Sequence, residues 1–171
     1  NQFRLDVTEL EALINPHTRL VIINSPQNPT GSVLTRSDVR RVAELAVEHD
    51  LMVMSDEIYC DILYEGDPVS IAQFPGMAER TIILDGFSKA YAMTGWRMGY
   101  GIMPVALVPS ISRLVTNSVS CTATFTQRAG LAALDGPQDD VRSMVEEFRC
   151  RRQVIVDGLN AIPRIRCGMP A

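Results

Sequence analysis

One side chain stands apart in this sequence because it is the only one of its type. Among 171 residues there are 16 basic side chains, and all of them are arginine except Lys89. An arginine stays protonated in a protein, whereas a lysine amine can lose its proton and act as a nucleophile or a base. Lys89 is therefore a candidate catalytic amine, although a general preference for arginine with one surviving surface lysine would leave the same composition.

Polar side chains follow three apolar runs of the sequence, and Lys89 is one of them. Asn28 follows the run 20–23, Asp56 follows the run 51–55, and Lys89 follows the run 81–84. Taken singly, they suit a turn, a helix cap and a solvated surface position. Because parallel sheets place ligands at the carboxyl ends of their strands, the three together predict a functional site at one edge of a sheet.

The elements that must position these groups alternate between strand and helix patterns. The runs 20–23, 51–55 and 81–84 are apolar on nearly every residue, which predicts strands buried on both faces, and 98–102 is a possible fourth strand. Helices are expected from Asp6, from Thr35 to about His49 with Val47 on the buried side, and over 105–118, 123–134 and 137–159, with Pro137 in the first turn. The pattern predicts an α/β fold of three layers, a mainly parallel central sheet flanked by helices.

Composition excludes several classes of protein. A hydrophobic content of 46% with 21% charged residues is typical of a globular domain and not of a disordered chain. The net charge of −4 argues against nucleic acid as a partner, and no apolar stretch is long enough to enter a membrane. The four cysteines form no Cys-x-x-Cys pair, and with only two histidines a metal site is not expected. Unpaired cysteines favour a reducing compartment, so we expect a cytoplasmic protein.

Three motifs taken in order resemble a known family. They are Asn28-Pro29-Thr30-Gly31, then Asp56-Glu57-Ile58-Tyr59, then the run from Ser88-Lys89 through Gly95-Trp96-Arg97-Met98-Gly99-Tyr100. Together they resemble the class I/II aminotransferases, which are pyridoxal-phosphate (PLP) enzymes of fold type I, similar to aspartate aminotransferase. The resemblance covers nearly the whole chain, and the spacing of 28 residues from Asn28 to Asp56 and eight from Lys89 to Arg97 makes it specific.

The resemblance implies catalytic roles for three residues. Lys89 would form a Schiff base with PLP and then carry a proton between the substrate α-carbon and the cofactor. Asp56 would keep the pyridine nitrogen protonated, so that the ring accepts electrons. Tyr59 would hydrogen-bond the 3′-oxygen of the ring.

The resemblance also implies residues that bind the cofactor without acting in the reaction. Asn28 would hydrogen-bond the same 3′-oxygen as Tyr59, and Arg97 would bind the phosphate with its fork of N–H donors. Ser88 would add a hydrogen bond to the phosphate. Many family members have serine three residues before the lysine, where this chain has Gly86. Gly86 leaves the phosphate to other donors, and its ordinary explanation is a tight turn after the third strand.

The resemblance implies a division of the chain and a partner. Residues 1–160 would be part of the PLP-binding large domain, and 161–171 would begin the connection to an absent small domain. The family's substrate-carboxylate arginine lies in that small domain, and Arg164 and Arg166 are interpreted here as surface residues. The isolated chain is therefore expected to be weakly active or inactive. The family works as a homodimer, and the segment with Thr122, Thr124 and Phe125 either approaches the partner or simply starts a helix.

The predicted function is transfer of an amino group between an amino acid and a 2-oxo acid. Two alternatives share the fold: a PLP-dependent lyase, and an aminotransferase-like sensor domain of a transcription regulator. An unrelated α/β binding domain would require the motifs to be accidental. The Gly95-Trp96-Arg97 context favours the aminotransferase over the lyase.

Overall fold

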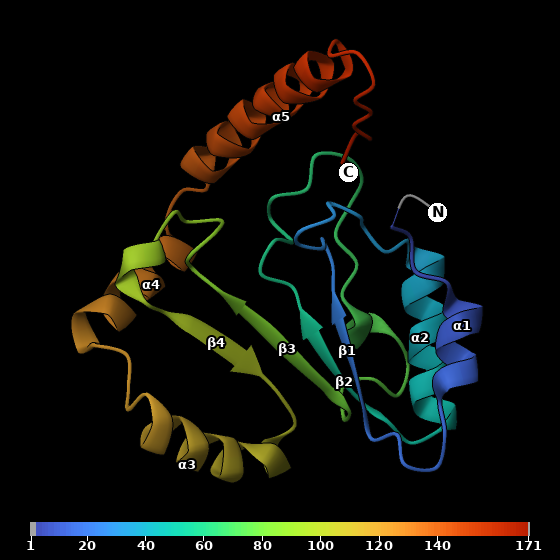
Figure 1. Cartoon of the computed structure of the whole chain (residues 1–171). Helices are drawn as coiled ribbons and strands as arrows, with labels where there is room; N and C mark the ends of the chain where they lie inside the picture. Colours follow the sequence, from blue (N-terminus) through green and yellow to red (C-terminus); the bar gives the residue numbers. More distant parts are fainter. Residues whose placement is uncertain (1–2, 171) are drawn as a thin grey trace.

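The sheet in the computed structural model, which describes residues 3–170, has four strands (Figure 1). Strands β1 (Leu20–Asn24), β2 (Met52–Asp56), β3 (Thr81–Gly86) and β4 (Gly99–Ile102) lie side by side in that order. The first three are parallel, and β4 runs antiparallel to β3. The predicted α/β class with a mainly parallel sheet flanked by helices is confirmed.

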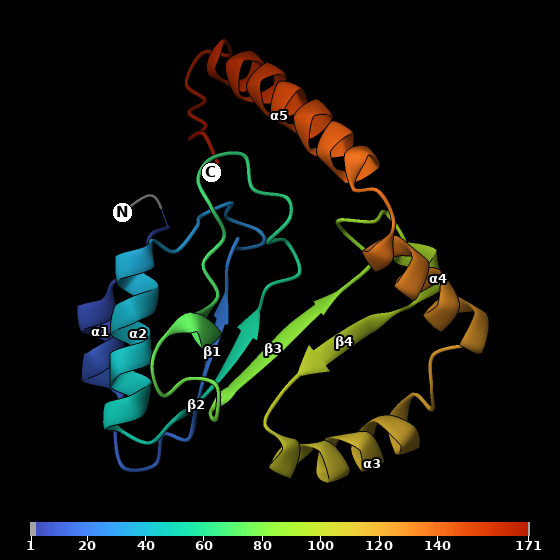
Figure 2. The same ribbon diagram turned by 180° about the vertical axis from the view of Figure 1, so that it is seen from behind.

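The five α-helices of residues 3–170 are distributed unevenly around the sheet (Figures 1 and 2). Helices α1 (Val7–Leu13) and α2 (Arg36–Glu48) lie side by side near β1 and β2, whereas α3 (Val108–Ser118) and α4 (Thr124–Asp135) lie beyond β4. Helix α5 (Asp139–Asn160) projects away from the sheet. Its N-cap is Gln138, so Pro137 precedes the helix and does not stand in its first turn. Short 3₁₀ helices occupy Ile71–Gln73, Thr94–Trp96 and Val105–Leu107.

Helix α2 begins where the sequence predicts because its first turn is capped from both sides. The Thr35 hydroxyl accepts a hydrogen bond from the backbone N–H of Asp38 at 3.2 Å, and the Asp38 carboxylate accepts one from the N–H of Thr35 at 2.9 Å. This reciprocal pair satisfies two backbone donors that the helix cannot pair internally. The cap therefore sets which face of α2 turns toward the sheet.

The main core lies between α2 and the sheet. Helix α2 contributes one apolar face, which packs on the start of β2 and on the segment around the first 3₁₀ helix. Its members are Val39, Val42, Ala43, Ala46, Leu51, Val53, Ile71, Phe74 and Met77. Val47, expected on the buried side, is exposed, because it stands beside that face rather than on it. Burial of each larger side chain stabilises the fold by about 1.5–3 kcal/mol.

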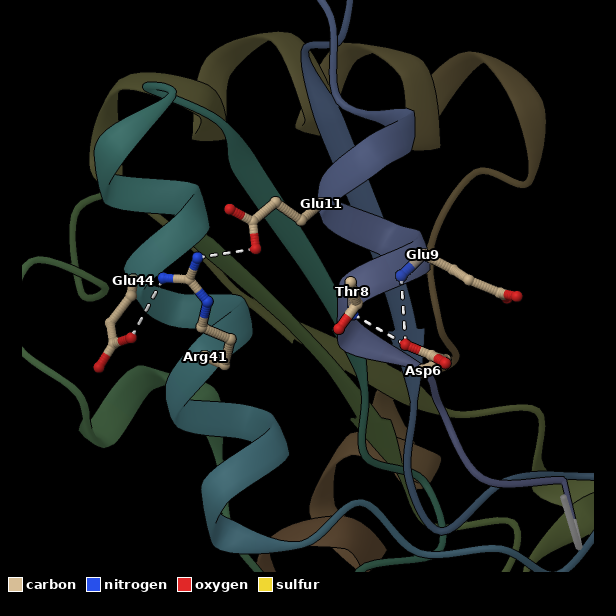
Figure 3. A network of polar contacts seen from close by, with 6 residues as sticks. All are labelled: Asp6, Thr8, Glu9, Glu11, Arg41 and Glu44. Atoms are coloured by element: carbon tan, nitrogen blue, oxygen red, sulfur yellow. Dashed lines mark hydrogen bonds and ion pairs between the residues drawn. The ribbon is translucent and has the colours of Figure 1, made fainter.

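Helix α1 packs against the core through Leu10 and is joined to α2 by one exposed ion pair (Figure 3). Arg41 of α2 contacts Glu11 of α1 at 2.8 Å and Glu44 of its own helix at 3.4 Å. At the start of α1, the Asp6 carboxylate accepts hydrogen bonds from the backbone N–H groups of Thr8 and Glu9, as the sequence predicts. Exposed pairs of this kind contribute about 0–1 kcal/mol, so they orient α1 more than they stabilise it.

The expectation that β1 is buried on both faces is wrong. Val21 and Ile23 pack against the core, but Ile22 on the opposite face is 66% exposed and Leu20 is exposed as well. Successive residues of a strand point to opposite faces, and in the described chain only one face of β1 is covered. The continuous apolar run correctly predicted a strand, but it did not predict that one face of the strand is exposed.

Candidate cofactor site

The end of β1 is joined to the end of β2 by a side chain. Asn24 pairs in register with Asp56, and its amide nitrogen donates to the Asp56 carbonyl oxygen at 3.1 Å. The amide oxygen of Asn24 accepts from the backbone N–H of Asn28 at 3.0 Å. One amide therefore fixes the loop that carries Asn28 to the neighbouring strand. Sequence reasoning missed Asn24, and the only available signal was its place at a strand end.

The loop after Asn28 is a closed turn. The Ser25–Pro26 and Asn28–Pro29 peptide bonds are cis, and the N–H of Gly31 donates to the Gln27 carbonyl oxygen at 2.8 Å. Gly31 has a φ of +69°, a conformation that favours glycine. A Cβ atom there would collide with the Cβ of Pro170, so the C-terminal segment approaches this loop closely.

The loop after β2 is closed at its base by Glu57. The Glu57 carboxylate accepts from the Ser55 hydroxyl at 2.9 Å and from the Ser70 hydroxyl at 2.8 Å. Ser70 in turn caps the 3₁₀ helix through the N–H of Ala72. Glu57 thus links Ser55 and Ser70, the two ends of the loop that carries Tyr59.

The connection after β3 turns sharply around an aromatic anchor. Phe87 is buried, and its ring lies 5.4 Å from that of Tyr91 and 5.8 Å from that of Tyr100. The N–H of Met93 donates to the Phe87 carbonyl oxygen at 3.1 Å, which folds the segment back on itself. Lys89 stands at the top of this turn, half-buried.

Lys89, Tyr59 and Asn28 meet although they come from three different loops. The Nζ atom of Lys89 lies 5.4 Å from the centroid of the Tyr59 ring, within the range of a cation–π contact. The Asn28 amide nitrogen donates to the Tyr59 hydroxyl at 3.1 Å. An amine, a phenol and an amide therefore share one surface, as expected of groups at the carboxyl ends of adjacent parallel strands.

These groups line an open cavity of about 610 Å³. Four of the six predicted site residues are in its wall, namely Asn28, Tyr59, Ser88 and Lys89. The other walls come from the loop after β2, helix α5 and the C-terminal segment, through Tyr64, Met144, Phe148 and Pro170. The cavity is thus built by segments far apart in the sequence.

The two remaining predicted residues lie next to this cavity rather than in its wall. Asp56 is the last residue of β2, and its carboxylate accepts from the N–H of Ile58 at 3.3 Å. Arg97 is exposed, has a φ of +53°, and donates to the Thr94 carbonyl oxygen at 2.9 Å. It lines a second hollow, which meets the first at Ala92.

Two residues of the second hollow belong to the segment for which a partner contact was considered. Thr122 and Phe125 line it, and the Phe125 ring packs 6.3 Å from the ring of Trp96. Thr124 is the first residue of α4, so this segment does start a helix. Phe125 nevertheless remains 71% exposed.

Burial and nearby acidic groups keep Cys60 protonated. Burial first, and then the nearby carboxylates of Asp61 and Asp85, raise the pKa of the Cys60 thiol to about 12. Burial raises the pKa of the Asp85 carboxyl, against hydrogen bonds from the Gly86 N–H at 2.6 Å and the Tyr100 hydroxyl at 2.8 Å. A thiol acts as a nucleophile only when ionised, so Cys60 is inert near neutral pH although it follows Tyr59 directly.

Within residues 3–170, no group of three or more His, Cys, Asp or Glu side chains is arranged to hold a metal ion. None of the helices in the same residues is long and apolar enough to span a membrane.

Comparison with known proteins gives consistent results for sequence and structure. The family model for aminotransferase class I and II matches residues 1–171. An aspartate aminotransferase of Musicola paradisiaca is 45% identical over 99% of this chain and 43% of its own length. Aromatic-amino-acid aminotransferase 2 of Thermococcus litoralis is 45% identical over 94% of this chain and 42% of its own.

Solved structures agree with these relatives. The aspartate aminotransferase from Rhizobium meliloti superposes with a TM-score of 0.93 at 41% identity, covering 98% of this chain and 43% of that one. The aromatic aminotransferase from Pyrococcus horikoshii gives a TM-score of 0.89 at 42% identity, covering 93% and 43%. The chain therefore spans less than half the length of the relatives it matches.

Proposed function

We propose a function from one premise, which is that this chain belongs to the aminotransferases of class I and II. The protein that carries it transfers an amino group between an amino acid and a 2-oxo acid, with PLP as its cofactor. Similar proteins are named for aspartate, for aromatic amino acids and for arginine with pyruvate. This range supports the reaction type without selecting one amino donor.

The donors in the cavity, together with Asp56 and Arg97 outside its wall, fit PLP. The cofactor carries an aldehyde, a ring oxygen beside it, a pyridine nitrogen and a phosphate, and when bound it supplies an electron-accepting ring for amino-acid chemistry. Lys89 would hold the aldehyde carbon, and Asn28 and Tyr59, already hydrogen-bonded to each other at 3.1 Å, would hold the ring oxygen. Asp56 would hold the pyridine N–H, and Arg97 with Ser88 the phosphate.

The residues of the chain would divide proton transfer and orientation between them. The freed Lys89 amine would take a proton from the substrate α-carbon and deliver it to the cofactor. A carboxylate suits the partner of a pyridinium N–H because an ionised acceptor strengthens the hydrogen bond. The phenol of Tyr59 and the amide of Asn28 orient the ring, which keeps the reacting carbon within reach of Lys89.

One observation carries this proposal: the Lys89 amine, 5.4 Å from the Tyr59 ring, shares a cavity with the Asn28–Tyr59 hydrogen bond. The test is borohydride reduction of the full-length protein with PLP, followed by peptide mass spectrometry. We expect a pyridoxyl label on Lys89, the only lysine of this segment, and no label here in Lys89→Arg. The arginine variant keeps the positive charge, so the comparison isolates the amine. A wild type without the label, or a Lys89→Arg variant that still carries a label in this segment, would contradict the proposal.

We further propose that the protein is a cytoplasmic homodimer. The support is the exposed Phe125 beside the hollow of Arg97, together with four cysteines that form no disulfide. Trp96 and Val119 are also exposed at this hollow, and neighbouring exposed apolar side chains of this kind are typical of a surface covered by another subunit. Sedimentation equilibrium of the full-length protein tests the dimer, and a monomer at micromolar concentration would exclude it.

A further inference from the structure

Arg152 of α5 lies where three separate segments meet. Its guanidinium carbon is 4.6 Å from the centroid of the Tyr64 ring, and its terminal nitrogens donate to the Glu65 carboxylate at 3.1 Å and to the Pro170 carbonyl oxygen at 2.6 Å. The side chain is only 9% exposed. One cation thus connects the helix, the loop after β2 and the C-terminal segment.

Two of the three partners of Arg152 are walls of the Lys89 cavity. Tyr64 and Pro170 both line it, and so do Phe148 and Met144, which stand one turn and two turns, respectively, before Arg152 on the same helix. Helix α5 projects from the sheet rather than packing along it (Figures 1 and 2). The position of this wall therefore depends on the few contacts at its far end, and Arg152 makes several of them.

The chemistry of these contacts is specific to arginine. A planar guanidinium can stack on an aromatic ring while its separate nitrogens donate in different directions. A lysine at the same place would keep the charge but offers one nitrogen and no plane. Because the side chain is largely removed from water, its contact with Glu65 is screened less than a surface pair, although Glu65 itself is exposed.

We propose that Arg152 is a positioning residue of the cofactor site. It fixes Tyr64 and the adjoining face of α5 as walls of the cavity and does not itself contact the reacting groups. This inference rests on the proposed function as far as PLP is concerned. The ordering of the loop by Arg152 is a separate and directly measurable part of it.

The test compares Arg152→Lys with Arg151→Lys in the full-length protein with and without PLP. Arg151 is the matched control, because it is the adjacent arginine and forms only an exposed pair with Glu147. Hydrogen exchange of the backbone amides in 60–66 should quicken in Arg152→Lys and not in Arg151→Lys, while the amides of β2 stay protected. The PLP dissociation constant, from an absorbance titration, should rise about tenfold.

Substitutions of Tyr64 distinguish loss of its stacking contact with Arg152 from a general loosening of the loop. Tyr64→Phe keeps the face on which Arg152 stacks and should show the amide exchange of the wild type in 60–66, whereas Tyr64→Leu should show the faster exchange expected of Arg152→Lys. If either arginine variant unfolds, the tyrosine pair gives the same comparison. Unchanged exchange in 60–66 for both Arg152→Lys and Tyr64→Leu, or equal effects in Arg151→Lys, would overturn the inference. Failure of the wild type to bind PLP would refute the proposed function, while the exchange data would still decide the role of Arg152.

Discussion

At the scale of single residues, the reason why position 86 requires glycine could be found in the structure but not in the sequence. The sequence suggested a tight turn, but Gly86 is the last residue of β3 and lies opposite Gly99 of β4. A Cβ atom on Gly86 would come within 2.7 Å of the Gly99 Cα atom and 3.0 Å of the Met98 carbonyl oxygen. The close approach of two backbones, rather than a special φ, requires glycine here.

Alanine at this position should therefore destabilise the protein. We expect Gly86→Ala to lower the free energy of unfolding by about 1–3 kcal/mol, because the backbone of β4 must move away. Gly158→Ala is the matched control, since nothing lies within 4 Å of a Cβ on this exposed residue of α5. The control should raise stability by about 0.5–1 kcal/mol. Urea unfolding measures both, and equal effects in the two variants would contradict the steric explanation.

Asp85 gives a prediction that depends on pH. Burial raises the pKa of its carboxyl, so the folded state holds this proton more tightly than the unfolded chain does. The free energy of unfolding should then fall as pH rises from the unfolded pKa, about 3.9, through the folded one. We expect Asp85→Asn to be more stable than the wild type at pH 7 and little different at pH 3.5.

The asparagine keeps most of the local bonding of Asp85. Its amide oxygen can accept from the Gly86 N–H, and its nitrogen can donate to the Tyr100 hydroxyl, so the variant mainly removes a charge. Asp67→Asn removes an equal charge from an exposed position. Urea unfolding at the two pH values should show a pH-dependent gain for Asp85→Asn only, and a gain of the same size for Asp67→Asn would point to net charge instead.

At the scale of elements, local sequence signals predicted where a helix or strand lies better than they predicted which of its faces is buried. The spacing of Thr35 and Asp38 located the start of α2, and both hydrogen bonds of that cap are present. The apolar run at Leu20 located β1, yet its burial pattern was wrong, because a run of branched residues encodes extended backbone and not what covers it. The antiparallel direction of β4 was also not predictable, since it depends on where the chain returns after the Lys89 turn.

The cap of α2 supports a stability prediction at this scale. Thr35→Ala removes the hydroxyl that accepts from the Asp38 N–H, and the free energy of unfolding should fall by about 1 kcal/mol. Thr35→Ser keeps the hydroxyl and should restore most of the loss. Thermal unfolding followed by circular dichroism compares the three proteins. A serine variant as unstable as the alanine variant would show that the threonine methyl group, and not the cap, is responsible.

At the scale of the whole molecule, the site was predictable as a set of residues but not as a set of contacts. The motifs placed Asn28, Tyr59 and Lys89 at strand ends, and the parallel sheet brought them into one cavity. No motif indicated that α5 and the C-terminal segment would form the opposite wall. Such contacts join residues distant in sequence, and they depend on side-chain packing that no local pattern records.

The antiparallel pairing of β3 with β4 has a consequence for how this chain can change during evolution. Asp85 pairs with Tyr100 and Gly86 with Gly99, so both ends of the excursion 87–98 are fixed to the same place in the sheet. Inserting or deleting one residue there would shift β4 by one position and move each of its side chains to the opposite face of the sheet, or else displace Lys89 relative to Arg97. Divergence within this stretch should therefore proceed by substitution at constant length, whereas exposed surface loops elsewhere are free to lengthen or shorten.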